Sequence, residues 1–314
     1  MPLDPLVKGF LDQLTAAPGP KMWEMSPTDA RAAFAVMMQL VGPKDVPIGK
    51  IENLAVPGPG GDIPIRVYAP VAGGGDPLPA LIYFHGGGFV IGDLETHDGL
   101  CRMFANEGGF RVIAVDYRLS PEHKFPAAVE DAYAAVTWIE ANAATFGVDP
   151  NRIALGGDSA GGALAAVVSQ MAKEKAAPKI AFQLLLFPTT HIGAETPSRS
   201  DFAVGYFLEG KTIEWFFENY LPTDIDKSDP RISPLCAPDL SGLPPAYIMV
   251  AGFDPLYDEG IQYAEKLKAA GVKVEIADYP DLVHCFIYLQ AVIPQAHEAM
   301  AAAAIAVRNA LAAV

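Results

Sequence analysis

The spacing of apolar and polar positions changes along this chain, and the change predicts an α/β fold. Short apolar runs suited to buried parallel strands alternate with longer segments in which apolar residues recur at helical spacing. The apolar runs lie at residues 80–84, 110–116, 152–155, 182–187, 246–250 and 274–277. The helical patterns lie at residues 127–145, 160–175, 259–270 and about 294–313. This order predicts a mostly parallel sheet covered by helices on both faces.

The N-terminal part of the chain has a different pattern. The first 45 or so residues are helical in character, and Ser26 and Pro27 open a helix that runs to about residue 40. Residues 51–68 alternate around a Pro- and Gly-rich turn, which predicts a β-hairpin.

A second segment interrupts the strand–helix alternation. Residues 189 to about 221 lack a clean strand and contain a helical pattern at 211–220. An insertion at this point would lie above the carboxyl ends of the strands, where open α/β folds bind ligands. We therefore expect a helical cap made of residues 1–45 and 189–225. The remaining residues, 46–188 and 226–314, would form the core.

Composition narrows the class of protein. The 314 residues are 51% hydrophobic, yet no apolar run approaches the eighteen or so residues of a membrane span. A net charge of −15 disfavours nucleic acid and anionic membrane surfaces as partners but does not penalise a neutral small molecule. The three cysteines form no disulfide or zinc pattern, and the N-terminus has no signal-peptide pattern. We expect a cytoplasmic protein without a metal.

The strongest chemical motif is G-x-S-x-G at residues 157–161. It places Ser159 between the apolar run 152–155 and the helical pattern 160–175, which is the strand–turn–helix context of a nucleophile elbow. A helix N-terminus also favours the negative charge of a tetrahedral intermediate. The alternative is that Ser159 only caps a glycine-rich helix.

A glycine-rich loop supplies candidate hydrogen-bond donors. His85 and three glycines, Gly86 to Gly88, directly follow the run 80–84. The amides of Gly87, Gly88 and Ala160 are the predicted oxyanion hole. His85 precedes Ser159, against the chain order of this fold, so we expect it to stabilise its loop by hydrogen bonding. The glycines at 73–75 are interpreted as a loop without function.

Three spaced motifs together resemble one family. They are H-G-G-G-F at 85–89, D-Y-R-L-S-P-E at 116–122 and G-D-S-A-G-G at 157–162. From about residue 48 onward the chain resembles the bacterial hormone-sensitive lipase family of esterases, in its GDSAG branch. The resemblance implies an α/β-hydrolase fold with a cap and carboxylesterase activity on small, short-acyl-chain esters. It implies no cofactor, and a homodimer by analogy.

The chain order of hydrolase triads, serine then acid then histidine, selects the base. His284 lies in a loop after the run 274–277, whereas His297 lies within the C-terminal helical pattern and His191 precedes any suitable acid. The family commonly has glycine after this histidine, where this chain has Cys285.

Asp254 is the predicted acid. It follows the run 246–250 and matches the D-P-L motif of the family. Asp258, four residues on, is the main competitor, and Asp278 and Asp281 are expected to cap their loop.

Apolar side chains of the two cap segments are candidates for binding substrate. The candidates are Trp23, Phe34, Met38, Phe202, Tyr206, Phe207 and Trp215, with Met22, Met25 and Met37 beside them. Ordinary lid packing is the alternative for each of them.

Three other functions are weighed against ester hydrolysis. Residues 205–212 fit the phosphate-loop pattern G-x-x-x-x-G-K-[ST], but no buried strand leads into them and bulky apolar residues fill the loop. Plant hormone receptors resemble these esterases but lack the base, which is present here as His284. Amidase, formamidase and lactonase activities use the same triad and stay open.

Overall fold

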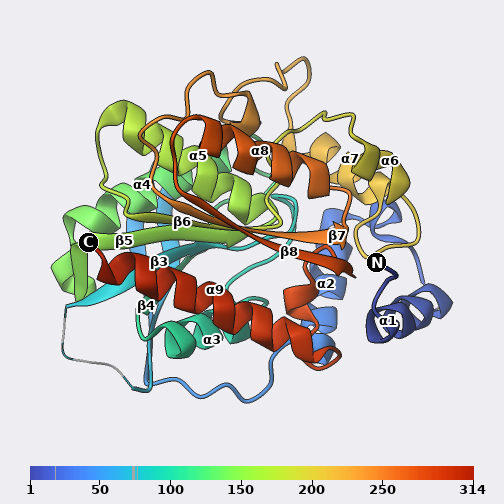
Figure 1. The fold of residues 1–314 in the computed structure, drawn as a ribbon, viewed down its shortest axis with the longest axis horizontal. Coiled ribbons are helices and arrows are strands. Elements are labelled where there is room, and N and C mark those ends of the chain that lie inside the picture. Colours follow the sequence, from blue (N-terminus) through green and yellow to red (C-terminus); the bar gives the residue numbers. More distant parts are fainter. Residues whose placement is uncertain (18, 73–74, 76) are drawn as a thin grey trace.

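The computed structural model describes residues 1–17, 19–72, 75 and 77–314, and its described strands form a single sheet (Figure 1). The eight strands lie in the order β1-β2-β4-β3-β5-β6-β7-β8. Their bounds are β1 Lys50–Gly58, β2 Gly61–Ala69, β3 Leu78–Phe84, β4 Arg111–Val115, β5 Val148–Asp158, β6 Phe182–Leu186, β7 Ala246–Phe253 and β8 Val274–Val283. The predicted hairpin is β1 and β2, which pair antiparallel, and β2 pairs antiparallel with β4. All pairs from β4 through β8 are parallel.

Helices cover both faces of the sheet, as predicted (Figure 1). One face carries α3 (Asp98–Gly108) and α9 (Pro294–Ala312), and the other carries α4 (Ala127–Ala141), α5 (Ala160–Lys175) and α8 (Tyr257–Ala269). The inner parallel strands β3 to β7 are largely buried on both sides, which explains why they contain continuous apolar runs, whereas most residues of the edge strand β8 are partly exposed. The helix α3 was not predicted from the periodicity; it is short and is followed by Gly109 in a left-handed conformation.

The remaining α-helices gather at one end of the sheet, at the right of Figure 1. They are α1 (Pro5–Ala16), α2 (Pro27–Val41), α6 (Pro197–Asp201) and α7 (Gly210–Tyr220). The described residues also form four 3-10 turns: η1 Met22–Glu24, η2 Ala143–Phe146, η3 Pro234–Cys236 and η4 Phe286–Tyr288. The Ser26 side chain accepts a hydrogen bond from the Asp29 amide and so begins α2 where predicted. Asp4 caps α1 in the same way, a start signal that the sequence analysis overlooked.

Among the described residues, no helix combines the length and apolar character that crossing a bilayer requires. Gly73 and Gly74, assigned above to a loop without function, lie outside the described residues.

Candidate active site

Ser159 stands on a strained turn between β5 and α5. Its φ of 53° and ψ of −115° lie outside the conformations that L-residues favour, as a nucleophile elbow requires. The Ser159 amide donates to the Leu186 carbonyl at 2.8 Å, which ties the turn to β6. A side chain at Gly161 would collide with the carbonyl oxygens of Phe84 and His85, so the glycine lets the elbow approach β3.

A continuous hydrogen-bonded chain joins three loops that are distant in sequence. His284 Nε2 lies 3.0 Å from Ser159 Oγ, and His284 Nδ1 lies 2.6 Å from Asp254 Oδ2. An ionised carboxylate only accepts hydrogen bonds, so Nδ1 carries the proton and Nε2 is left to accept the serine proton. His284 and Asp254 are both buried, at 4% and 1% exposed, which keeps water away from this chain of contacts.

The carboxylate of Asp254 faces His284, whereas the nearby carboxylates have other hydrogen-bond partners. Asp254 Oδ1 accepts from the Leu256 amide at 2.8 Å, which leaves Oδ2 facing His284. The competitor Asp258 accepts instead from the Ser198 amide of α6, also at 2.8 Å. Asp278 accepts from the Tyr257 hydroxyl at 3.1 Å. Of these three carboxylates, Asp254 is the one that contacts the His284 imidazole.

Three backbone amides beside Ser159 are unpaired within the part of the chain that the structure describes. Gly87, Gly88 and Ala160 donate no backbone hydrogen bond there. Gly88 has a φ of 59°, and a Cβ at this position would run into the Phe216 ring. The glycine loop therefore requires residues without side chains, and its amides are available to bind an oxygen atom.

His85 is engaged within its own loop. Its Nδ1 lies 2.8 Å from the Gly86 carbonyl, and its ring stacks on Tyr117 with centroids 4.4 Å apart. Burial and the nearby His97 lower the pKa of His85 to about 4, so the ring is neutral at physiological pH. These contacts fit a structural role.

Comparison with known proteins places this arrangement in a family. The family model described as the alpha/beta hydrolase fold matches residues 81–288, which contain the elbow, the glycine loop and the whole hydrogen-bonded chain. This chain belongs to the α/β-hydrolase family. The expected resemblance to its hormone-sensitive-lipase type is confirmed.

Two mycobacterial proteins are similar to this chain over much of its length. Carboxylic ester hydrolase LipN of Mycobacterium tuberculosis is 50% identical over 245 residues, which cover 76% of this chain and 65% of LipN, so the match spans just under two thirds of LipN. Carboxylesterase NlhH of the same organism is 42% identical over 319 residues, covering 98% of this chain and 96% of NlhH.

Solved α/β-hydrolase structures agree with the fold. LAE6, an alpha/beta hydrolase enzyme from the metagenome of Lake Arreo, superposes with a TM-score of 0.96 at 42% identity over 98% of both chains. A hyperthermophilic esterase from Pyrobaculum calidifontis superposes with a TM-score of 0.93 at 40% identity, over 98% of this chain and 99% of that one.

A cavity of about 540 Å³ opens onto Ser159 and His284 in this α/β hydrolase. Four of the predicted apolar candidates line it: Trp23, Phe34, Tyr206 and Phe207. The neighbouring Met22, Met25 and Met37 line it as well. The cavity thus lies between the N-terminal helices and the insertion.

The other three candidates, Met38, Phe202 and Trp215, are not among the described residues that line the cavity. Met38 is one helical turn beyond Phe34 and lines a separate polar pocket between α2 and α3. Phe202 packs against Tyr206 and Phe253, and Trp215 packs beside Phe216. Each is apolar and in a cap segment, but its direction is set by helix packing.

Part of the cavity wall was not predicted from the sequence. Leu11 and Leu14 of α1, and Phe216 and Phe217 of α7, line the cavity. The spacing of Val7, Leu11 and Leu14 at four and three residues was the available signal for α1.

Cys285 occupies a position suited to glycine. Its φ of 52° and ψ of 29° are left-handed, which explains why a family can prefer glycine there. The thiol is 3% exposed and faces the cavity. Burial raises the pKa of Cys285 well above its usual value, so the group is a neutral thiol.

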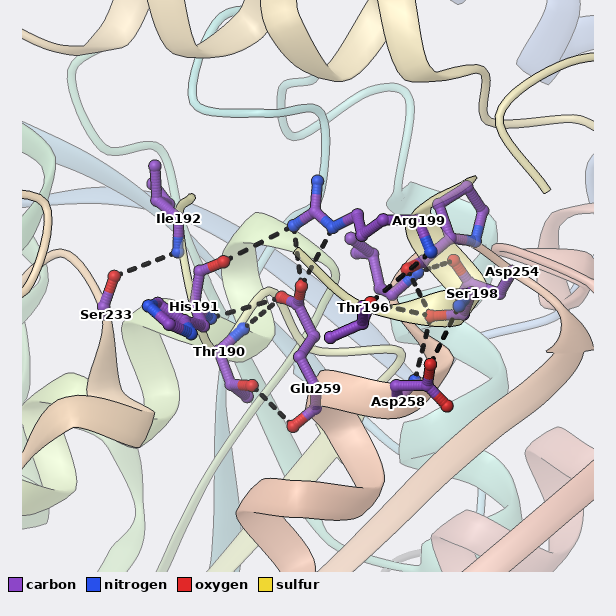
Figure 2. Close-up of polar contacts among 12 residues, drawn as sticks. Thr190, His191, Ile192, Thr196, Ser198, Arg199, Ser233, Asp254, Asp258 and Glu259 are labelled. Carbon is purple, nitrogen blue, oxygen red and sulfur yellow. Dashed lines mark hydrogen bonds and ion pairs between the residues drawn. The ribbon is translucent and has the colours of Figure 1, made fainter. Parts of the chain in front are cut away.

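A buried ion pair anchors the insertion to the helix that follows the acid loop (Figure 2). Glu259, which is fully buried, accepts from Arg199 Nη2 at 2.7 Å and Nε at 3.1 Å. Its other oxygen accepts from the amides of Thr190 and His191 at 2.9 and 3.2 Å. Burial raises the pKa of Glu259, and Arg199 opposes the rise. This pair therefore fixes α6 of the insertion relative to α8.

The phosphate-loop pattern has no phosphate-loop structure. Residues 203–208 form bends, and among the described residues no strand leads into Gly205. Tyr206 and Phe207 face the cavity instead.

Proposed function

We propose that this protein is a serine carboxylesterase that hydrolyses small, short-acyl-chain esters. The observation that carries the proposal is the hydrogen-bonded chain from Ser159 through His284 to Asp254 at the base of a largely apolar cavity. The relatives named carboxylic ester hydrolase and carboxylesterase support the reaction class.

In the proposed mechanism, Ser159 Oγ attacks the ester carbonyl while His284 Nε2 takes its proton. The carbonyl oxygen becomes an oxyanion that the amides of Gly87, Gly88 and Ala160 stabilise. His284 then protonates the leaving alcohol, and Asp254 holds the imidazole tautomer and stabilises the imidazolium. Water, activated by the same histidine, hydrolyses the acyl-enzyme and frees the acid.

The shape and chemistry of the cavity support a small, mostly apolar substrate. A volume of about 540 Å³ lies in the usual range for small-molecule sites. Lys21 and Glu209 both line the cavity, and they form an ion pair of 3.7 Å, so neither presents an unbalanced charge. We expect turnover to peak at acyl chains of about two to six carbons, and a peak at long acyl groups would contradict the proposal.

Ser159→Ala tests the function directly. A panel of p-nitrophenyl esters of increasing acyl length gives kcat and KM, and a fluorophosphonate followed by peptide mapping identifies the reactive serine. We expect labelling at Ser159 and a loss of ester turnover in the variant. Ser169→Ala is the control, because that buried hydroxyl of the same helix donates only to the Ala165 carbonyl. Turnover at the wild-type rate in Ser159→Ala would refute the function.

Amides, formamides and lactones belong in the same panel, because one triad serves all acyl transfers. Failure of the fluorophosphonate to label Ser159 would favour a binding protein of the same fold.

Two finer properties are also proposed. We place the protein in the cytoplasm, where its three free thiols would stay reduced. We propose a homodimer by analogy with similar proteins, and a light-scattering mass equal to one chain would contradict it.

A further inference from the structure

A fully buried carboxylate lies directly behind the reacting groups. Asp158 is the last residue of β5, precedes Ser159 and is 0% exposed. The proposed mechanism gives it no task. A buried carboxylate is costly unless hydrogen bonds satisfy it, so its partners indicate what it is for.

The partners of Asp158 come from separate catalytic loops. Oδ1 accepts from the Gly86 amide at 3.1 Å, and Gly86 opens the predicted oxyanion loop. Oδ2 accepts from the Tyr288 hydroxyl, four residues after His284. A Cβ at Gly86 would collide with the Asp158 carboxylate, so the loop is shaped around this contact.

Two further side chains complete the cluster. The Tyr83 hydroxyl of β3 donates to Oδ1 at 2.6 Å. His97 Nε2 lies 3.2 Å from the Tyr288 hydroxyl and 3.6 Å from Oδ1. Burial alone would raise the pKa of Asp158, but His97 and the two tyrosine hydroxyls outweigh it and lower the pKa to about 2. The group is therefore a carboxylate throughout the range in which the protein would work.

We propose that Asp158 is a positioning residue that holds the oxyanion loop, the nucleophile elbow and the base loop in one arrangement. The inference rests on the proposed function. A carboxylate can accept on both oxygens, so it can receive the Gly86 amide and two tyrosine hydroxyls at once. An asparagine of the same shape has one acceptor oxygen and so cannot serve every donor.

The cluster also reaches the cavity wall. Phe34 of α2 packs against Tyr288 with ring centroids 5.9 Å apart and against His97 at 6.1 Å. Phe34 and Tyr288 both line the cavity. The same carboxylate therefore connects the predicted oxyanion amides with the substrate-facing side of α2.

Asp158→Ala and Asp158→Asn test the inference in the full-length protein. We expect Asp158→Ala to lower kcat by about 100-fold with KM changed less than about threefold, because displacing an oxyanion donor costs a factor of this size. Asp158→Asn should recover part of that loss, since it keeps one acceptor. The inhibition constant of a short trifluoromethyl ketone, which mimics the tetrahedral intermediate, should rise by the factor by which kcat/KM falls.

Tyr288→Phe provides a second, milder variant in case the Asp158 variants do not fold. It removes one donor from the base loop, and we expect kcat to fall by about tenfold with the same parallel rise in the inhibition constant. The matched control is Tyr263→Phe, which removes a buried hydroxyl that accepts from Gln170 away from the site. Active sites are counted by the end point of fluorophosphonate labelling.

The outcomes separate this inference from the proposed function. A wild-type protein that hydrolyses no ester refutes the function itself. The positioning role alone is refuted if the wild type is active and a folded Asp158 variant, or Tyr288→Phe, keeps its kcat and inhibition constant within threefold of wild type. A rise in KM at constant kcat also overturns it, because that pattern reports altered substrate binding.

Discussion

Replacing Arg199 by methionine removes one half of the buried ion pair that anchors the cap insertion. Methionine keeps much of the aliphatic volume but loses both hydrogen bonds to Glu259, at 2.7 and 3.1 Å. Glu259 then keeps only the amides of Thr190 and His191 as partners for its carboxylate. Breaking one side of such a buried pair costs about 3–5 kcal/mol of unfolding free energy, because a charge is left unpaired.

The loss should depend on pH in a defined direction. Burial already raises the pKa of Glu259 above 4.5, and removing Arg199 raises it further. A carboxyl group with a raised pKa in the folded state takes away stability as pH climbs from its unfolded pKa through its folded pKa. At pH 5 the variant can protonate Glu259 and so avoid an unpaired buried charge. At pH 8 it must either bury an unpaired carboxylate or keep a proton on Glu259 against the solution pH, and both cost free energy. We therefore expect the full loss at pH 8 and a smaller one at pH 5.

Urea unfolding at the two pH values measures both effects. Lys173→Met is the matched control, since Lys173 and Asp239 form an ion pair of equal length, 2.7 Å, with the aspartate side chain 62% exposed. Such a surface pair contributes less than about 1 kcal/mol. The double variant Arg199→Met/Glu259→Gln should recover most of the stability at pH 8.

The ion pair should also influence substrate binding. The Arg199 guanidinium lies 5.7 Å from the centroid of Phe217, which lines the cavity. We expect KM to rise in Arg199→Met with little change in kcat, because the cap wall moves while the reacting groups do not. The reasoning is refuted if Arg199→Met is no less stable than Lys173→Met, or if its loss is the same at both pH values.

Three further substitutions test individual positions. Cys285→Gly should keep kcat/KM within about threefold, because glycine suits the left-handed backbone there; a loss above about tenfold would show that the thiol has an active role. Gly88→Ala should lower kcat by at least about 100-fold, since its Cβ would meet the Phe216 ring and displace an oxyanion amide; near-normal turnover of p-nitrophenyl acetate would remove Gly88 from the oxyanion hole. Burial, aided by Asp93 and opposed by Arg66, raises the pKa of Asp116 to about 6. Ionising Asp116 therefore costs stability as pH rises from the ordinary value of 3.8 through the folded value of about 6. Asp116→Asn should gain up to about 3 kcal/mol at pH 8 and nothing at pH 4 in urea unfolding; equal gains at both would count against this assignment.

The strand and helix order of this protein was predictable because it depends on local periodicity. Buried parallel strands give unbroken apolar runs and amphipathic helices give a spacing of three to four, so the sheet and its two helical layers follow from the residues. The glycine loop at 86–88 and the elbow at 157–161 could be predicted equally well, because the backbone of each requires glycine at positions where a side chain would clash. Such requirements act over a few residues, and a sequence displays them directly.

Contacts between distant segments were decided by the tertiary structure alone. The D-P-L motif and the preceding apolar run favoured Asp254 over Asp258, but the contacts themselves, with His284 for one and with Ser198 for the other, are set by the turn of the chain after β7. The role inferred for Asp158 depends on donors at positions 83, 86 and 288, which no local pattern relates to one another. Trp215 and Met38 show the same limit, because packing across helices sets which way a side chain points. Periodicity tells which face of an element is apolar, but which neighbour covers that face is a property of the folded chain.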